Sequence, residues 1–196
     1  MALSDITQFV LDNYEIYEWR HASAVMVKDF PQEWDDLMTV LTVFRLKKSY
    51  INVGGGNRSL VSASIDGGFF ARGWRETEFD TRIVVDQNET HSPTHKVDNF
   101  KNKIAVEMEW NNKDPFFDRD LNNFRLLFEL RVVSVGVIIT RTDALQEIFN
   151  TLGRGGSYGE ATTHMRKLLP KLEGGGGGGC PVLAFGIKPS LYLEDT

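Results

Sequence analysis

Three acidic residues near the middle of the chain have the types and spacing of a carboxylate site. Asp98 precedes Glu107 by nine positions, and Glu107 and Glu109 share one face of a strand expected over residues 103–110. We expect the three carboxylates to converge. Carboxylate oxygens suit hard cations, and a Mg²⁺ held by Asp98, Glu107 and the Met108 carbonyl could activate a water beside a phosphate. The alternative, from spacing alone, is that these acids are only the solvent face of the strand.

The elements that must position these acids follow from apolar periodicity and turn residues. Strand 103–110, a helix between Pro115 and Arg131 and an apolar strand over 131–140 predict a right-handed crossover between parallel strands. The fold class that we predict is α/β, with a central mixed β-sheet flanked by helices. The other expected elements are helices over 31–44, 59–71, 143–152 and 158–169, strands over 81–86 and 181–187, and a polar turn over 87–93.

Composition limits the class of protein. The chain has 196 residues, of which 41% are apolar and 25% charged, as in a soluble globular protein with one domain spanning 1–196. Cys180 is the only cysteine, which excludes an internal disulfide and favours a reducing, cytoplasmic compartment. The longest apolar stretch, 132–139, is far shorter than the ~20 residues of a membrane span, so we expect no membrane contact.

The charge is unevenly distributed along the chain. The formal net charge is −5, yet residues 41–60 contain four basic residues and no acid. Residues 134–171 contain five basic and three acidic residues. The chain therefore has local basic surfaces that could face a polyanion.

Two glycine-rich segments lie between the predicted helices and strands. Residues 53–59 form an expected flexible turn, but Gly54–Ser59 lacks the Gly-Lys-Ser/Thr ending of a phosphate-binding loop, so we expect no nucleotide cofactor. Six consecutive glycines over 174–179 predict a mobile loop.

The segment around the three acids resembles the active-site segment of the PD-(D/E)XK nucleases. Val97–Trp110 is most similar to the BglII/BstYI group of type II restriction endonucleases, in which an aspartate also stands nine residues before a strand glutamate. The segment 71–76 and the C-terminal progression through 135–140, 157–160 and 181–187 resemble that group in order. Glu109 occupies the place of the lysine found in the broader superfamily, and a glutamate or glutamine there is familiar within the group.

The resemblance implies roles for the acids. Asp98 and Glu107 would be metal ligands, and Glu109 would position or deprotonate the attacking water. Glu76 is a fourth candidate, as a further ligand or water-positioning carboxylate, with a plain surface acid as the alternative. The implied cofactor is Mg²⁺, for which Mn²⁺ would substitute.

The resemblance also implies a substrate and an assembly. The chain would be a type II endonuclease that cuts both strands of a short palindromic site in double-stranded DNA and leaves 5′-phosphate ends. One site per chain implies a homodimer. Two alternatives stay open: an endonuclease that requires a modified base, and a DNA-binding protein that is catalytically silent.

Candidate DNA contacts flank the expected catalytic core at about 75–140. One set lies near the first glycine-rich turn or follows the strand, with ordinary solvated charge as the alternative: Lys47, Lys48, Asn57, Arg58 and Lys113. The expected DNA-reading region, at about 141–170, contributes Arg141, Arg154, Ser157, Tyr158, Thr162, Thr163, His164 and Lys167.

Overall fold

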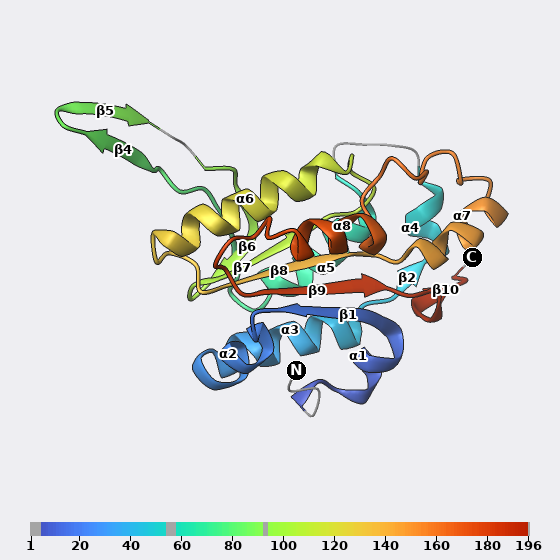
Figure 1. Cartoon of the computed structure of the whole chain (residues 1–196). Helices are drawn as coiled ribbons and strands as arrows, with labels where there is room; N and C mark the ends of the chain where they lie inside the picture. Colours follow the sequence, from blue (N-terminus) through green and yellow to red (C-terminus); the bar gives the residue numbers. More distant parts are fainter. Residues whose placement is uncertain (1–4, 54–57, 92–93, 196) are drawn as a thin grey trace.

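A six-stranded mixed sheet forms the centre of the computed structural model, which describes residues 5–53, 58–91 and 94–195 (Figure 1). The strand order is β1-β9-β8-β7-β6-β3. These strands are β1 (Tyr14–Trp19), β3 (Arg75–Thr77), β6 (Val97–Lys101), β7 (Ile104–Met108), β8 (Val135–Arg141) and β9 (Val182–Ile187).

The three central strands are parallel, and the outer pairs are antiparallel. Strand β7 pairs with β8, and β8 with β9, in parallel, whereas β6 pairs with both β7 and β3 in the antiparallel sense. Helix α6 (Pro115–Glu129) connects β7 to β8, so the predicted strand, helix and parallel strand are confirmed. The α/β fold class with a mixed central sheet is also confirmed.

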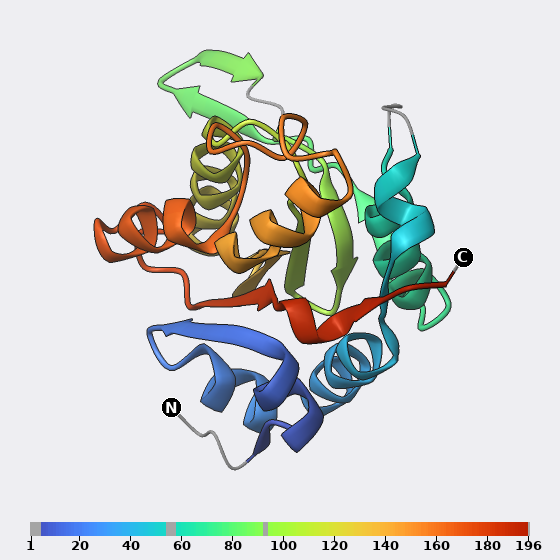
Figure 2. The same cartoon turned by 90° about the vertical axis from the view of Figure 1, so that its right-hand side faces the viewer.

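Helices cover both faces of the sheet (Figure 2). On one face, Val106, Val137 and Phe185 pack in a core with the N-terminal helices and with α5 and α7. On the other face, Ala105 and Ile138 pack against α6 and α8. The helices besides α6 are α1 (Gln8–Asn13), α2 (Ala22–Asp29), α3 (Pro31–Val43), α4 (Lys48–Asn52), α5 (Leu60–Phe70), α7 (Gln146–Thr151) and α8 (Met165–Glu173).

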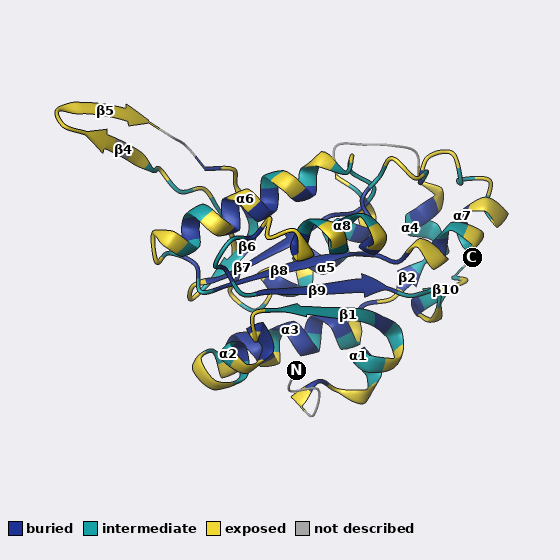
Figure 3. Ribbon diagram, viewed as in Figure 1, coloured by how far each residue is buried: buried dark blue, intermediate teal, exposed yellow. Residues whose placement is uncertain are grey.

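Burial follows this layering. Every residue of β7, β8 and β9 is buried, as expected for central parallel strands covered on both faces (Figure 3).

The smaller elements are β2 (Leu46–Lys47) paired with β10 (Tyr192–Leu193), and the 3₁₀ turns η2 (Asp143–Leu145) and η3 (Pro189–Leu191). None of the described helices is long and apolar enough to span a bilayer.

A two-residue turn sets the register of β6 and β7. Asn102 and Lys103 both have positive φ, 44° and 69°, as a tight turn matched to the twist of the two strands requires. This turn pairs Lys101 with Ile104 and Asn99 with Val106. The next residues outward are Asp98 and Glu107, so the nine-residue spacing follows from the length of the hairpin.

Two sequence predictions were wrong in detail. Part of the polar turn predicted over 87–93 is strand β5 (Asn88–His91), which pairs with β4 (Arg82–Val85) in a projecting hairpin (Figure 1). The described side chains of this hairpin are exposed. A strand with no buried face lacks the alternation of apolar and polar residues by which strands are predicted, so β5 was missed. The helix predicted from residue 158 begins at Met165, because hydrogen bonds to Asn112 and Arg141 hold residues 158–163 in turns.

The glycine run 174–179 forms consecutive turns that pack against α6. A Cβ added at Gly178 would lie 2.6 Å from Arg125 Cγ, and one at Gly179 would lie 3.2 Å from Phe128 Cε1. Glycine at these two positions therefore allows the backbone to approach α6 closely.

Candidate active site

Asp98 and Glu107 form an interlocked pair at the end of the β6–β7 hairpin. The backbone N–H of Asp98 donates to Glu107 Oε2 at 3.2 Å. The backbone N–H of Met108 donates to Asp98 Oδ2 at 3.1 Å. Each carboxylate is thus fixed by the main chain of the opposite strand, and one oxygen of each is not used in these bonds.

Burial makes this pair unfavourable in its charged form. The pKa of Asp98 is raised to about 6, mainly by burial, and the charges of Asp66 and Glu109 contribute to this rise. Burial also raises the pKa of Glu107 well above its usual value, and the charges of Asp120 and Asp98 add to that effect. A cation at the pair would relieve this repulsion.

Glu109 is held by a different set of partners. Its Oε1 accepts from Arg119 Nη2 at 3.0 Å, and its Oε2 accepts from Asn112 Nδ2 at 2.7 Å. Arg119 also pairs with the buried Asp120 at 2.8 Å. Within the described residues, no three or more His, Cys, Asp or Glu side chains are grouped as a metal site. The described contacts of Glu109 are thus with Arg119 of α6 and with Asn112, and the expected ion ligands, which are Asp98, Glu107 and the Met108 carbonyl, do not include it.

The remaining pair fits a divalent cation. Glu107 Oε1 is buried and has no hydrogen-bond partner among the described residues. An orphaned carboxylate oxygen in a buried site is costly unless a cation or water meets it. Together with Asp98 and the carbonyl of Met108, it offers only oxygen ligands, which are the ligands that Mg²⁺ prefers.

A cleft of about 820 Å³ opens beside the pair. Its walls come from α4 and α5, from the strand segments around Glu76, Asp98 and Met108, and from the turns that follow α7. Figure 2 shows these helices beside the sheet. Three arginines and three acids line it: Arg58, Arg75, Arg154, Asp66, Glu76 and Asp98. Glu76 therefore shares the cleft with Asp98, although it is exposed and lies 3.5 Å from Lys96.

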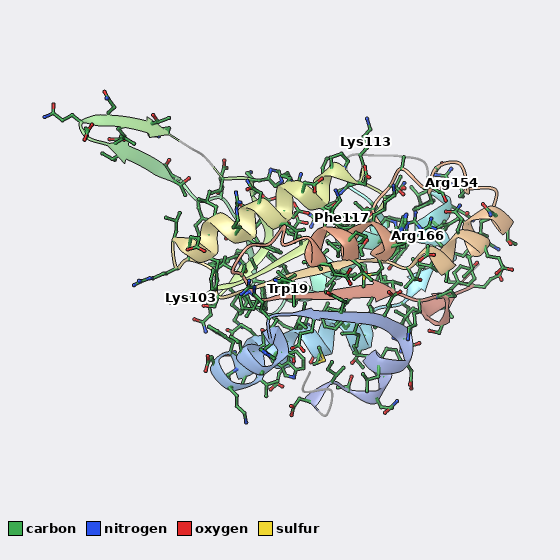
Figure 4. All side chains as sticks on the ribbon, in the orientation of Figure 1. Trp19, Lys103, Lys113, Phe117, Arg154 and Arg166 are labelled. Carbon is green, nitrogen blue, oxygen red and sulfur yellow. The ribbon has the colours of Figure 1, made fainter. Side chains whose placement is uncertain are left out.

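The residues of the first set of candidate DNA contacts lie in different places, and only some of them are at the cleft. Arg58 lines the cleft, whereas Lys48 is paired with Glu194 at 2.6 Å and Lys47 lies over the Tyr50 ring. Asn57 lies outside the described residues. Lys113 is exposed, and its side chain points away from the body of the protein (Figure 4).

The candidate residues of the expected DNA-reading region also lie in different places. Arg154, labelled in Figure 4, lines the cleft together with Tyr158. Ser157 is exposed, and Lys167 lies 3.6 Å from Asp114 at the start of α6. Thr163 and His164 are buried, and Thr162 is half-buried and accepts a hydrogen bond from Arg141.

Arg141 supports the fold of this region. It is 1% exposed, and its Nη2 donates to the Tyr158 carbonyl and to Thr162 Oγ1, both at 2.9 Å. Its guanidinium also lies over the Phe149 ring. In this structure the Arg141 guanidinium is therefore engaged within the protein, between β8 and the turns over residues 158–162.

Sequence reasoning missed four polar residues around the site. Asp66 and Asn99 are buried beside Asp98, and Arg119 and Asp120 engage or flank Glu109. A signal existed for the two acids: each interrupts the apolar stripe of a predicted helix. An acid on the buried face of a helix needs a partner, which marks it as part of a polar site.

A comparison with protein families identifies the family of the chain. A family model described as restriction endonuclease BglII/BglIII matches residues 14–187, which is most of the chain. The chain belongs to this family of restriction endonucleases, and it is accordingly a nuclease of the DNA-cutting class. No curated protein matches the chain.

Proposed function

We propose that the chain is a Mg²⁺-dependent type II restriction endonuclease that cuts both strands of a short palindromic site and leaves 5′-phosphate ends. The observation that carries the proposal is the Asp98–Glu107 pair beside the cleft, with Glu107 Oε1 lacking a described partner. Asp98, Glu107 and the Met108 carbonyl would hold the ion, and Mn²⁺ would replace Mg²⁺. The ion would supply positive charge to the phosphate and lower the pKa of a water.

The chain's own residues would orient the reaction. Arginines of the cleft bind the phosphate backbone, and Glu109 positions the attacking water once its contacts with Arg119 and Asn112 loosen. The water oxygen bonds to phosphorus as the bond from phosphorus to the 3′ oxygen breaks. The water gives up its proton to a base and the 3′ oxygen takes one from solvent, which leaves a 5′-phosphate and a 3′-hydroxyl.

Two such sites are needed to cut a duplex. Each chain carries one carboxylate pair, and the two strands of a palindrome are related by a two-fold axis. A homodimer with the same axis would place one site at each scissile bond.

The test is digestion of methylated and unmethylated genomic DNA with Mg²⁺, followed by sequencing of the fragment ends. We expect one recurring palindromic end sequence, no cutting in EDTA, and no cutting by Glu107→Gln. Fragments from methylated DNA alone would instead indicate an enzyme that requires a modified base. Binding without cutting under every condition would contradict the proposal and indicate a silent DNA-binding protein.

A further inference from the structure

Arg58 and Asp66 form an ion pair in the wall of the cleft. Arg58 Nη2 donates to Asp66 Oδ2 at 2.5 Å, and the two side chains are 63% and 8% exposed. Asp98 lines the same cleft. An exposed guanidinium is thus anchored by a buried carboxylate in the cleft that Asp98 also lines.

Strand β6 fixes Asp66 in turn. The second carboxylate oxygen, Oδ1, accepts from Asn99 Nδ2 at 2.8 Å, and both residues are buried. Asn99 is the residue that follows Asp98 in the chain. The path from Arg58 through Asp66 to Asn99 therefore ties the guanidinium to the strand segment that carries the first carboxylate of the site.

The charges of this group act on one another. The hydrogen bond that Arg58 donates to Asp66 is the main cause that raises the pKa of Arg58, and the charges of Asp98 and Glu76 contribute. Asp66 in turn contributes to the raised pKa of Asp98, after burial. These mutual effects agree with the shared cleft in placing the guanidinium near the carboxylate pair.

We propose that Arg58 is a catalytic residue that donates to the non-bridging oxygens of the scissile phosphate, and that Asp66 and Asn99 are its positioning residues. This inference rests on the proposed function. A guanidinium has five N–H donors in a planar fork, and among the described residues Asp66 takes one. The others are left for a phosphate.

An anchored arginine favours the transition state over the bound substrate. Negative charge builds on the non-bridging oxygens as the water oxygen adds to phosphorus, and a cation already fixed in place needs no reorganisation to meet it. An arginine that only clamps the backbone would bind both states equally and would leave the rate of the bound complex unchanged.

The test uses Arg58→Ala, Asp66→Asn and their double variant, on a duplex that carries the sequence found at the fragment ends. Single-turnover cleavage gives the rate, and binding to the same duplex in a Glu107→Gln background gives the affinity without cutting. We expect Arg58→Ala to slow cleavage of bound DNA by about a hundredfold, with a far smaller loss of affinity.

Asp66→Asn tests positioning separately. Asparagine keeps an oxygen acceptor for Asn99 but loses the charge that anchors Arg58, so we expect at least about a tenfold loss in rate. The double variant should be no slower than Arg58→Ala, because Asp66 acts through Arg58. Thermal unfolding checks that each variant is folded.

Arg82→Ala is the matched control, because Arg82 is also an exposed arginine, paired with Glu89 at 2.8 Å outside the cleft. We expect it to leave the rate unchanged. A loss of affinity in Arg58→Ala at an unchanged rate would overturn the catalytic role, and multiplying losses in the double variant would overturn positioning. A parent chain that cuts no DNA would overturn the proposed function itself, and this inference with it.

Discussion

The backbone of Asp98 donates to the side chain of Glu107 at 3.2 Å, while the Asp98 carboxylate accepts from the N–H of Met108 at 3.1 Å. The two acids therefore hold one another through the main chain of paired strands. The proximity of the buried Glu107 carboxylate and the half-buried Asp98 carboxylate costs stability in the absence of a cation, and this cost makes the site testable without DNA.

The stability of the metal-free chain should depend on Asp98 and pH. The folded state raises the pKa of Asp98 from 3.8 to about 6, so it binds the proton more tightly than the unfolded state. The penalty of the charged form is absent below pH 3.8 and complete above pH 6. Asp98→Asn should raise the free energy of unfolding in EDTA by about 2 kcal/mol at pH 8, after allowance for partial exposure.

Denaturant unfolding at pH 4, 6 and 8 measures this difference. The stability gained by Asp98→Asn should shrink towards pH 4. At pH 8, added Mg²⁺ should stabilise the parent chain and leave the variant unchanged. A gain of equal size at all three values of pH would show that charge at Asp98 is not its cause.

Replacing either of the two proposed metal-binding carboxylates should strongly slow DNA cleavage and leave DNA binding nearly unchanged. Glu107→Gln and Asp98→Asn should each lower the cleavage rate by roughly a thousandfold, which corresponds to about 4 kcal/mol of transition-state stabilisation. DNA affinity should remain near that of the parent, because it depends mainly on contacts of basic residues with phosphates. Plasmid cleavage and gel-shift titration measure the two quantities, with exposed Glu89→Gln as the control, and near-parental cutting by either variant would reject the ligand assignment.

Arg154 should contribute to DNA affinity without regard to sequence. It lines the cleft, and its removal should weaken binding to matched and random duplexes alike and reduce the salt slope by about one. Fluorescence anisotropy over a range of NaCl concentrations measures the slope. Lys28→Ala, at an exposed position of α2, is the control, and an unchanged slope for Arg154→Ala would place this side chain off the DNA path.

Gly136 should be essential for packing α6 on the sheet. A Cβ at this buried position of β8 would lie 2.3 Å from Phe124 Cδ2, so Gly136→Ala should lower the free energy of unfolding by about 1–3 kcal/mol. The double variant with Phe124→Leu should lose less than the sum of the two single losses, because leucine removes the clash. Strictly additive losses in urea unfolding would contradict the contact.

Local patterns were sufficient to predict the central elements from sequence. The apolar run over β8 and the stripe of α6 predicted a parallel crossover, because both patterns report burial directly. The nine-residue spacing of Asp98 and Glu107 marked the two acids as a site, whereas the two-residue turn that converts this spacing into strand register was not predicted.

Long-range partners were the part that sequence could not predict. Strand β1 was not anticipated, since its antiparallel place beside β9 depends on residues more than 160 positions away. The engagement of Glu109 by Arg119 and the anchoring of Arg58 by Asp66 likewise depend on how α6 and α5 pack, which no local spacing records.

The most direct measurement of the central claim is anomalous scattering from crystals of the chain soaked in Mn²⁺. We expect a peak within coordination distance of Asp98, Glu107 and the Met108 carbonyl, which is lost in Glu107→Gln crystals. A peak at other residues, or none beside this pair under conditions in which Mn²⁺ supports cleavage, would contradict the account.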